Sequence, residues 1–225
     1  MPITPSHLSL RERDRNCSPR LDLGGRAAGL VLFSDRYPRH LVDKVLEAQR
    51  LEEGRRPLRL AHLDVGQLIT DVTASQRALC ESRHFTISCS LPPDDVDLRG
   101  SFDPQSLEQI LVNLVENAVK YAHDAHDRTI HVDVTRRAQG AEASVVVVVA
   151  DHGPGIPAAE GERVFQRLHR VERAGPEHIA GSGLGLALVR ELARAHGGDA
   201  LLVARPGFAC ALEVTFPLRT GIHAP

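Results

Sequence analysis

Four short motifs follow one another in a fixed order along this chain, and they constrain its fold more than any other feature. They read NLVENAVKY at residues 113–121, DHGPGIP at 151–157, ERVFQRL at 162–168 and GSGLGLALV at 181–189. Each motif alone is weak, because a glycine cluster such as GSGLG usually marks only a turn or the start of a helix. Their combination within one domain length indicates a single folded unit that needs all four.

The order and spacing of these motifs resemble the ATP-binding domain of sensor histidine kinases, within a superfamily shared with gyrase, MutL and the large heat-shock chaperone. The resemblance covers roughly residues 40–220. It implies a Bergerat-type α+β fold, a two-layer α/β sandwich with helices on one face of a mixed sheet. The expected divisions are a poorly defined N-terminal segment (1–36), a helix and linker (37–59) and a histidine-kinase-like ATPase domain (60–220).

The helix and linker are expected in RHLVDKVLEAQRLEEGRRPLRL, where Leu41, Val45 and Ala48 share one helical face. This stretch resembles the second helix of the kinase dimerisation hairpin and the linker that leads into the ATPase domain. The alternative is an amphipathic helix that packs on its own domain.

Apolar periodicity outside the motifs predicts a similar architecture. Asp64 is placed to cap a helix in which apolar residues recur at helical spacing as far as Cys80. Strands are expected where apolar residues alternate with polar ones or run continuously, and the continuous run indicates a central strand covered on both faces. Helices interspersed with such strands favour a two-layer sandwich. The expected strands lie at residues 85–91, 130–134, 145–149, 201–203 and 211–216.

Another helix is expected after Asp103, because its carboxylate can accept unpaired N–H groups and the following proline fits the first helical position. Its leucines cluster on one side, whereas Asn113, Asn117 and Lys120 form a narrow stripe at the border of that side. Glu116 should face solvent. The stripe can line a pocket; the alternative is a polar helix shoulder with a chance pair of asparagines.

The resemblance assigns this stripe to a complex of ATP with Mg²⁺. It implies that Asn117 supplies a hard oxygen ligand to the metal. Asn113 stands one helical turn earlier, and Lys120 lies beside the phosphates as a point charge. Asn113 and Lys120 are the expected catalytic residues, and Tyr121 is expected to flank the nucleotide.

The second motif begins with Asp151, directly after the apolar run, and Gly153 and Gly155 follow in a tight turn. Glycine allows backbone conformations and close approaches that a side chain would block. The resemblance implies that Asp151 accepts a hydrogen bond from the adenine amino group and so selects ATP over GTP. Otherwise, an aspartate in a turn after a strand is commonplace.

The fourth motif places Gly181, Gly183, Leu184 and Gly185 before a helix that should end at residues 197–198. Backbone N–H groups at a glycine-rich helix start can bind phosphate without charged side chains. All four residues are therefore expected to contact the nucleotide. The spacing is GxGxG, so the dinucleotide fingerprint GxGxxG is not met.

The third motif supplies Phe165, which matches the aromatic box of the family and is expected to contribute to the cofactor site. The second aromatic position of that box holds Leu168 here. The polar, glycine-containing stretch between Phe165 and Gly181 predicts a lid that orders when nucleotide binds.

Composition excludes several other classes of protein. A net charge of -2, two tyrosines and no tryptophan give no footprint for nucleic-acid binding. The longest apolar run, residues 145–150, is too short to span a bilayer, and no signal-peptide pattern is present, so a cytoplasmic protein without a membrane segment is expected. The four cysteines lack metal-ligand spacing and are expected to be buried thiols.

The residue at position 113 bears on the reaction. By resemblance, ATP-hydrolysing members of the superfamily carry a glutamate base one turn before the Mg²⁺-binding asparagine, and this chain has Asn113 there. An amide cannot accept a proton from water, which favours phosphoryl transfer to a protein over hydrolysis. The expected function is that of a protein-histidine kinase domain in two-component signalling, and the alternatives are an anti-sigma-factor-type serine kinase or a non-catalytic nucleotide-binding module.

The phosphoacceptor is not evident in this chain. Histidine kinases present it in an H-E-x-x-T/N-P-like segment, which does not occur here, and His7 and His40 match poorly. The alternatives are a truncated kinase, a subunit that phosphorylates a partner and a nucleotide-binding module without catalysis. The expected partner is a response regulator or a histidine-bearing protein. Whether the chain forms a homodimer is left open.

Overall fold

The computed structural model describes residues 57–139, 142–171 and 182–218, all within the unit Pro38–Pro225. The expected N-terminal segment, most of the expected helix and linker, His7, His40 and Gly181 lie outside the described residues, so the expectations for them stay predictions. In the part of the chain that the structure describes, no helix is long and apolar enough to cross a membrane.

A five-stranded mixed sheet forms one layer of the fold, with strand order β2-β4-β5-β7-β6. β2 pairs parallel with β4, and the other neighbours are antiparallel. β5 occupies the centre, as its apolar run predicted, and consecutive valines along it are buried. β1 and β3 form a separate antiparallel pair. The strands are β1 (Ala61–Asp64), β2 (Thr86–Ser90), β3 (Arg99–Phe102), β4 (Thr129–Gln139), β5 (Glu142–Asp151), β6 (Asp199–Leu202) and β7 (Cys210–Pro217).

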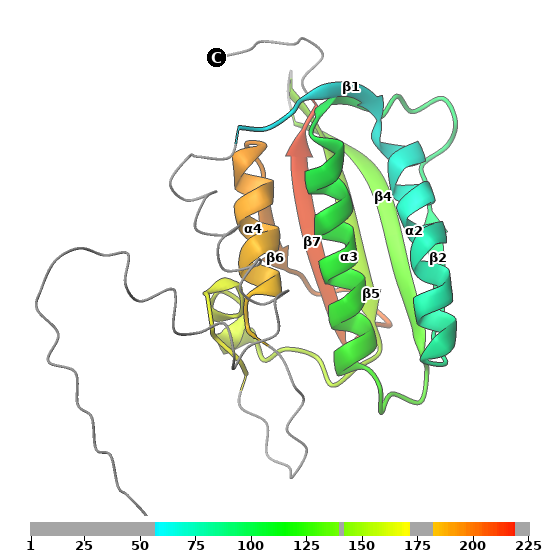
Figure 1. Ribbon diagram of the computed structural model, residues 1–225, viewed down its shortest axis with the longest axis vertical. Coiled ribbons are helices and arrows are strands. Elements are labelled where there is room, and N and C mark those ends of the chain that lie inside the picture. The colour runs from blue at the N-terminus through cyan, green and yellow to red at the C-terminus, as the bar shows by residue number, and fades with distance from the viewer. Residues whose placement is uncertain (1–56, 140–141, 172–181, 219–225) are drawn as a thin grey trace, which may run out of the picture. The chain divides into compact units, whose positions relative to one another are not determined.

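The second layer consists of α2 (Val65–Ser82), α3 (Pro104–Tyr121) and α4 (Gly185–Ala195), which cover one face of the sheet (Figure 1). The two-layer α+β prediction is therefore confirmed. So are both predicted helix starts: Asp64 Oδ1 accepts from the N–H of Gln67 at 3.2 Å, and Asp103 Oδ1 accepts from the N–H of Ser106 at 3.2 Å.

The predicted first strand was one residue too long at its end. β2 stops at Ser90, and Leu91 lies outside it with its side chain exposed. The two prolines that follow have no N–H to donate to a strand ladder, so the alternation does not continue as a strand. The strands expected at residues 201–203 and 211–216 are present as β6 and β7, which pair as an antiparallel hairpin.

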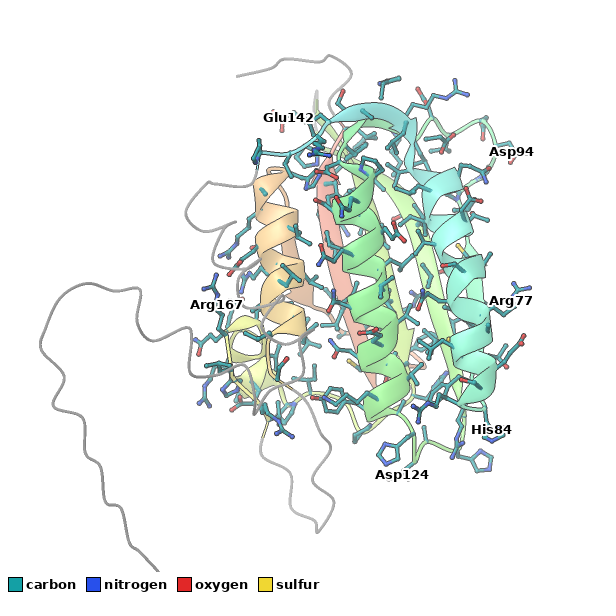
Figure 2. All side chains as sticks on the ribbon, viewed as in Figure 1. Arg77, His84, Asp94, Asp124, Glu142 and Arg167 are labelled. Carbon is teal, nitrogen blue, oxygen red and sulfur yellow. The ribbon has the colours of Figure 1, made fainter. Side chains whose placement is uncertain are left out.

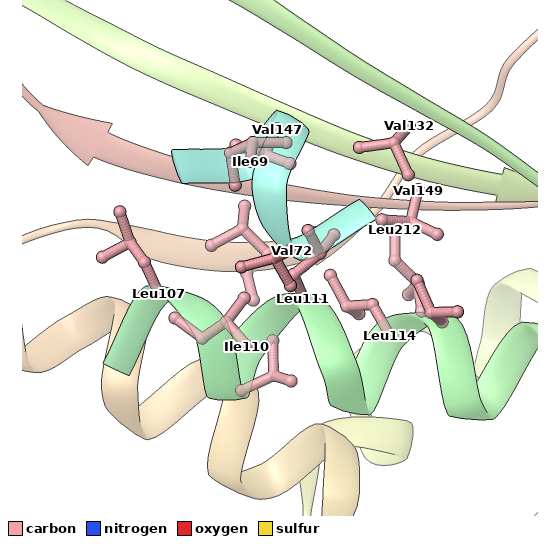
Figure 3. Close-up of a cluster of buried hydrophobic side chains, with 14 of the residues drawn as sticks. Ile69, Val72, Leu107, Ile110, Leu111, Leu114, Val132, Val147, Val149 and Leu212 are labelled. Carbon is pink, nitrogen blue, oxygen red and sulfur yellow. The ribbon is translucent and has the colours of Figure 1, made fainter. Parts of the chain in front are cut away.

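Apolar side chains fill the space between the two layers (Figure 3). Leu107, Leu111 and Leu114 of α3 point at Val147 and Val149 of β5, with further side chains from α2, β4 and β7 around them. Each fully buried large apolar side chain stabilises the fold by roughly 1.5–3 kcal/mol. This packing fixes α3 against the sheet and leaves its polar stripe at one border of the buried face.

α3 and α4 meet at a fully buried set of side chains that we name the closed end, comprising Phe102, Asp103, His196 and Phe216. The N–H of Asp103 donates to His196 Nε2 at 3.2 Å, and His196 Nδ1 lies 2.7 Å from the carbonyl oxygen of Leu192. A backbone N–H can only donate, so Nε2 carries no proton and Nδ1 donates to the carbonyl. Since His196 follows α4 and Asp103 precedes α3, the two helices run antiparallel.

Candidate functional site

The polar stripe of α3 lies where the sequence predicted it. Asn113 is only 4% exposed, and its Nδ2 donates to the carbonyl oxygen of Gln109 at 2.7 Å. Asn117 is half-buried one turn further along, and Glu116 is exposed, as expected. Amide oxygens such as these are hard ligands of the kind that Mg²⁺ takes.

The first residue of α4 lies directly against this stripe. A Cβ placed on Gly185 would stand 3.3 Å from Asn113 Oδ1 and 3.7 Å from Asn117 Nδ2. The start of the α4 helix therefore lies close against Asn113 and Asn117, and the missing side chain of Gly185 permits this approach.

The N-terminus of α4 is suited to an anion. Within the described residues, no side chain caps its first turn, and that turn holds no acidic residue. Unpaired N–H groups and the helix dipole at such a terminus attract phosphate. Leu184, just before the helix, has a buried side chain, so it can contribute to this terminus only through its backbone.

Lys120 and Tyr121 stand at the C-terminal end of α3, the same end of the helix pair. Lys120 Nζ donates to Tyr121 Oη at 3.0 Å and lies 4.5 Å from the centre of the tyrosine ring. The ammonium group is thus held close to the aromatic ring beside the two asparagines. Figure 2 shows Asp124 just beyond this end of α3, whereas Glu142 lies at the opposite end of the sheet.

Asp151, the last residue of β5, is 7% exposed and begins a turn. Its Oδ1 accepts from the N–H of Gly153 at 2.8 Å. A Cβ on Gly153 would lie 3.1 Å from Ala122, so only glycine lets this turn approach the end of α3 so closely. Gly155 has a φ of 72°, the left-handed region that favours glycine. The carboxylate of Asp151 is therefore held next to the end of α3.

The third motif packs beside α4. Phe165 is buried at the end of a short 3-10 helix, η3 (Arg163–Phe165), and the guanidinium of Arg190 lies 5.1 Å from its ring centre. Leu168, in contrast, is 70% exposed, with a φ of 61°, and its N–H donates to the carbonyl oxygen of Gly183 at 3.0 Å. A second 3-10 helix, η2 (Ala158–Glu160), precedes η3.

An ion-pair network on α4 supports Phe165. Arg190 donates two hydrogen bonds to Asp199, at 2.8 and 3.1 Å, and one to Glu162 at 2.7 Å. The bond to Asp199 raises the pKa of Arg190 further above its usual range. Burial raises the pKa of Asp199, but bonds from Arg190, Arg194 and the N–H of Ala200 outweigh it and hold that pKa well below its usual range. Both groups are charged at neutral pH.

The structure thus brings together Asn113, Asn117 and Gly185, and it places the turn of Asp151 against the end of α3. Among the described residues, no group of three or more His, Cys, Asp or Glu side chains could hold a metal ion. Sequence reasoning missed Arg190 and His196, and it missed Ala209, whose N–H donates to the carbonyl oxygen of Asp151 at 3.1 Å. The expected strands at residues 201–203 and 211–216 flank Ala209, but only the register of β5 with β7 brings it to Asp151.

Known proteins are similar to this chain in sequence. Residues 102–220 match the family described as histidine kinase-, DNA gyrase B-, and HSP90-like ATPase. The sensor histidine kinase WalK of Bacillus subtilis is 33% identical over 141 residues, which cover 63% of this chain and 22% of WalK. The sensor-like histidine kinase SenX3 of Mycobacterium tuberculosis is 29% identical over 192 residues, which cover 85% of this chain and 45% of SenX3. The chain therefore spans less than half the length of either relative.

Solved structures agree with the sequence comparisons. Full-length ShkA in complex with AMPPNP superposes with a TM-score of 0.61 at 26% identity, over 85% of this chain and 36% of ShkA. The mycobacterial sensor histidine kinase MprB, with a TM-score of 0.55 and 23% identity over 71% of this chain and 98% of that structure, shares the fold. With over half of its residues matched, this chain belongs to the family of histidine kinase-, DNA gyrase B- and HSP90-like ATPases.

Proposed function

We propose that this chain binds ATP with Mg²⁺ between α3 and α4, as the catalytic ATP-binding domain of a sensor histidine kinase, and that it transfers the γ-phosphoryl group to a histidine of a protein acceptor. The observation that carries the proposal is the contact of Gly185 with Asn113 and Asn117. It sets a phosphate-binding helix terminus beside hard oxygen ligands, which is the pairing that a metal-bound triphosphate requires.

Each site residue has a role in this proposal. Asn117 would hold Mg²⁺, which when bound offsets charge on the phosphate oxygens. Lys120 adds a positive charge beside the phosphates, and Asp151 accepts a hydrogen bond from the adenine amino group. The remaining residues shape the pocket or bind through their backbone: Asn113, Tyr121, Gly153, Gly155, Phe165, Gly181, Gly183, Leu184 and Gly185.

Transfer to a protein is favoured over hydrolysis by the residue one turn before Asn117. Asn113 is an amide whose Nδ2 donates to the carbonyl oxygen of Gln109. An amide has no basic electron pair for the proton of an attacking water, so this position cannot act as a general base. In-line transfer then depends on the placement of an acceptor side chain beside the γ-phosphate.

The acceptor and partners belong to the same proposal. Several relatives are named sensor histidine kinases, and ShkA is solved with AMPPNP, an ATP analogue. We place this domain in the cytoplasm, where ATP is available, with a histidine-bearing partner or hairpin and a response regulator downstream.

A thermal-shift titration with AMPPNP tests nucleotide binding. The stabilisation should grow as RT ln(1 + [L]/Kd) and should be larger with Mg²⁺ than with a chelator. A second assay uses γ-labelled ATP, and the chain alone should take up little acid-labile, base-stable label. Robust label of that kind that disappears in His7→Gln would contradict the expected acceptor in a partner, and no shift with AMPPNP would overturn the proposal as a whole.

A further inference from the structure

Three aromatic rings gather on the sheet face that the helices leave uncovered, at the end where β5 stops. We name His131, His152 and Phe208 the ring cluster. His131 alternates along β4 with the core residues Ile130 and Val132, so it points to the face opposite the helices. The Phe208 ring stacks on His152 with centres 4.8 Å apart and meets His131 edge-on at 4.9 Å.

Polar contacts hold the two histidines of the ring cluster. His131 Nδ1 lies 3.0 Å from the hydroxyl of Ser88 on β2, and His152 Nε2 lies 3.4 Å from a carboxylate oxygen of Asp127. These contacts tie the cluster to the edge strand and to the loop before β4.

Phe208 is held from its own hairpin as well. The guanidinium of Arg205 lies 5.0 Å from the Phe208 ring centre, and its Nη1 lies 2.6 Å from Asp133 Oδ2 on β4. The turn between β6 and β7 is therefore anchored across the uncovered face of the sheet. Phe208 is held by His131 of β4, by His152 after β5 and by Arg205 of its own hairpin.

The ring cluster lies directly behind the turn that carries Asp151. His152 is the next residue in the chain, and its side chain leaves the strand on the side opposite to Asp151. Ala209, next to Phe208, donates its N–H to the carbonyl oxygen of Asp151 at 3.1 Å. Its own carbonyl oxygen would lie 2.6 Å from a Cβ on Gly155. One ring stack and two backbone contacts thus join this hairpin to the turn.

We propose that Phe208 and His152 are positioning residues for adenine recognition, because their stack fixes the turn and thereby the direction of the Asp151 carboxylate. The proposal rests on the function proposed above. Neither ring touches the nucleotide. The two rings act on the nucleotide only by positioning Asp151. Their loss should therefore change the discrimination between bases and leave phosphate binding unchanged.

The readout that isolates this effect is the affinity ratio between ATP and inosine triphosphate. Inosine carries a carbonyl oxygen where adenine has its amino group, so the group at that position can no longer donate to Asp151. Discrimination should therefore be about tenfold or more in the unaltered protein, the amount that one satisfied buried hydrogen bond gives. Asp151→Ala should reduce this affinity ratio to about one, which is the value expected when adenine recognition is lost completely.

Phe208→Ala should lower the ratio severalfold towards that limit, and Phe208→Trp should restore it because the ring stack is kept. His152→Ala should act like Phe208→Ala, whereas His152→Phe should keep the ratio, since it keeps a ring for the stack. Phe216→Leu is the matched control: it trims a buried aromatic side chain of β7 that pairs with Val145, at the opposite end of β5 from Asp151, and should lower stability without changing the ratio.

The outcomes separate the two proposals. If the unaltered protein does not distinguish the two nucleotides, adenine recognition by Asp151 is wrong. If it does, and Asp151→Ala removes the discrimination while both alanine variants of the ring cluster retain it, the positioning role is wrong and the proposed function stands. Should Phe208→Ala fail to fold, Phe208→Leu and His152→Ala give the same decision.

Discussion

The two ends of the helix pair α3 and α4 are built differently. At the closed end, Asp103 and His196 are buried and bonded to each other, and Phe102 and Phe216 pack against the histidine ring. At the other end, Asn113 and Asn117 face the start of α4 across Gly185, and no side chain within the described residues caps that start. The same two helices thus end in a polar-aromatic contact on one side and in a close approach of a glycine to two amide side chains on the other.

This difference indicates that one end of the helix pair stabilises the fold and the other end binds the ligand. Asp103 accepts from the N–H of Arg59 at 2.9 Å and of Ser106 at 3.2 Å, so the buried carboxylate is satisfied within the chain. A satisfied buried network rigidifies a fold. The glycine and amide groups of the other end gain most from a ligand, because a helix terminus attracts anions and amide oxygens bind hard cations. Substitutions at the two ends should therefore affect different measurements.

His196→Ala should have the largest effect on stability. It removes a buried ring from between Phe102 and Phe216 and leaves the N–H of Asp103 without its acceptor, at a combined cost of about 2–4 kcal/mol in the free energy of unfolding. Urea denaturation measures it, and nucleotide affinity at a temperature where the variant is folded should change less than threefold. His196→Phe separates the loss of packing from the loss of hydrogen bonds, since it keeps a ring and loses only the hydrogen bonds. A loss below about 0.5 kcal/mol for the alanine variant would mean that the closed end does not hold the helices together.

Asp151→Ala should show the opposite behaviour. The adenine amino group would lose its acceptor, at a typical cost of about 1–3 kcal/mol, so the Kd for ATP should rise roughly tenfold or more. Asp151→Asn is the sharper variant, because its Oδ1 can still accept from the N–H of Gly153 while its amide group donates towards the adenine. Isothermal titration gives the Kd and denaturation the stability. If these variants bound ATP normally but melted at a much lower temperature, Asp151 would be a structural residue, and the proposed difference between the two ends would be wrong.

Asn117→Ala should have a smaller and more specific effect. Mg²⁺ keeps most of its ligands as water and phosphate oxygens, so the loss of one protein oxygen should weaken binding severalfold and not abolish it. The thermal shift with AMPPNP should become nearly equal in Mg²⁺ and in chelator. The exposed Glu116, one residue earlier on α3, offers the control Glu116→Gln, which should keep the metal dependence. A full metal dependence in Asn117→Ala would exclude that side chain as a ligand.

The contrast between the ends also explains what could be predicted from the sequence. Asp64, Asp103 and the alternating strands were found because caps and periodicity are local signals. The asparagine stripe and Gly185 were recognised through motifs, and their contact was implied by a resemblance. The roles of His196 and Phe208 could not be predicted, because their partners Asp103 and His152 lie far along the chain. Only the packing of α4 and the register of β5 with β7 bring these partners near. The alternation extends to Leu91, but the two prolines that follow cannot donate to a strand ladder, so β2 ends at Ser90.

Asp199→Asn should have the smallest effect and a distinctive pH dependence. Asp199 bonds to Arg190 and Arg194, and Arg190 also covers Phe165, so this network links the start of β6 near the closed end with the third motif. Its side chain is 37% exposed, so solvent screening limits the contribution to about 0.5–1 kcal/mol. The pKa of Asp199 is lowered in the folded state. Its contribution is therefore present above the unfolded pKa, about 3.9, and is lost as the pH falls towards the folded one.

The measurement compares the free energy of unfolding of both proteins in urea at pH 7 and near pH 3. Other carboxylates titrate in both proteins alike, so the difference between the two isolates Asp199. That difference should be largest at pH 7 and should shrink at pH 3, because the unfolded chain then binds a proton at this position that the folded chain does not. Glu108→Gln, which removes the same charge at an exposed position of α3, should show no such change. A difference that grew on acidification would mean that the bonds from the arginines do not outweigh burial. The network would then hold Phe165 by packing alone.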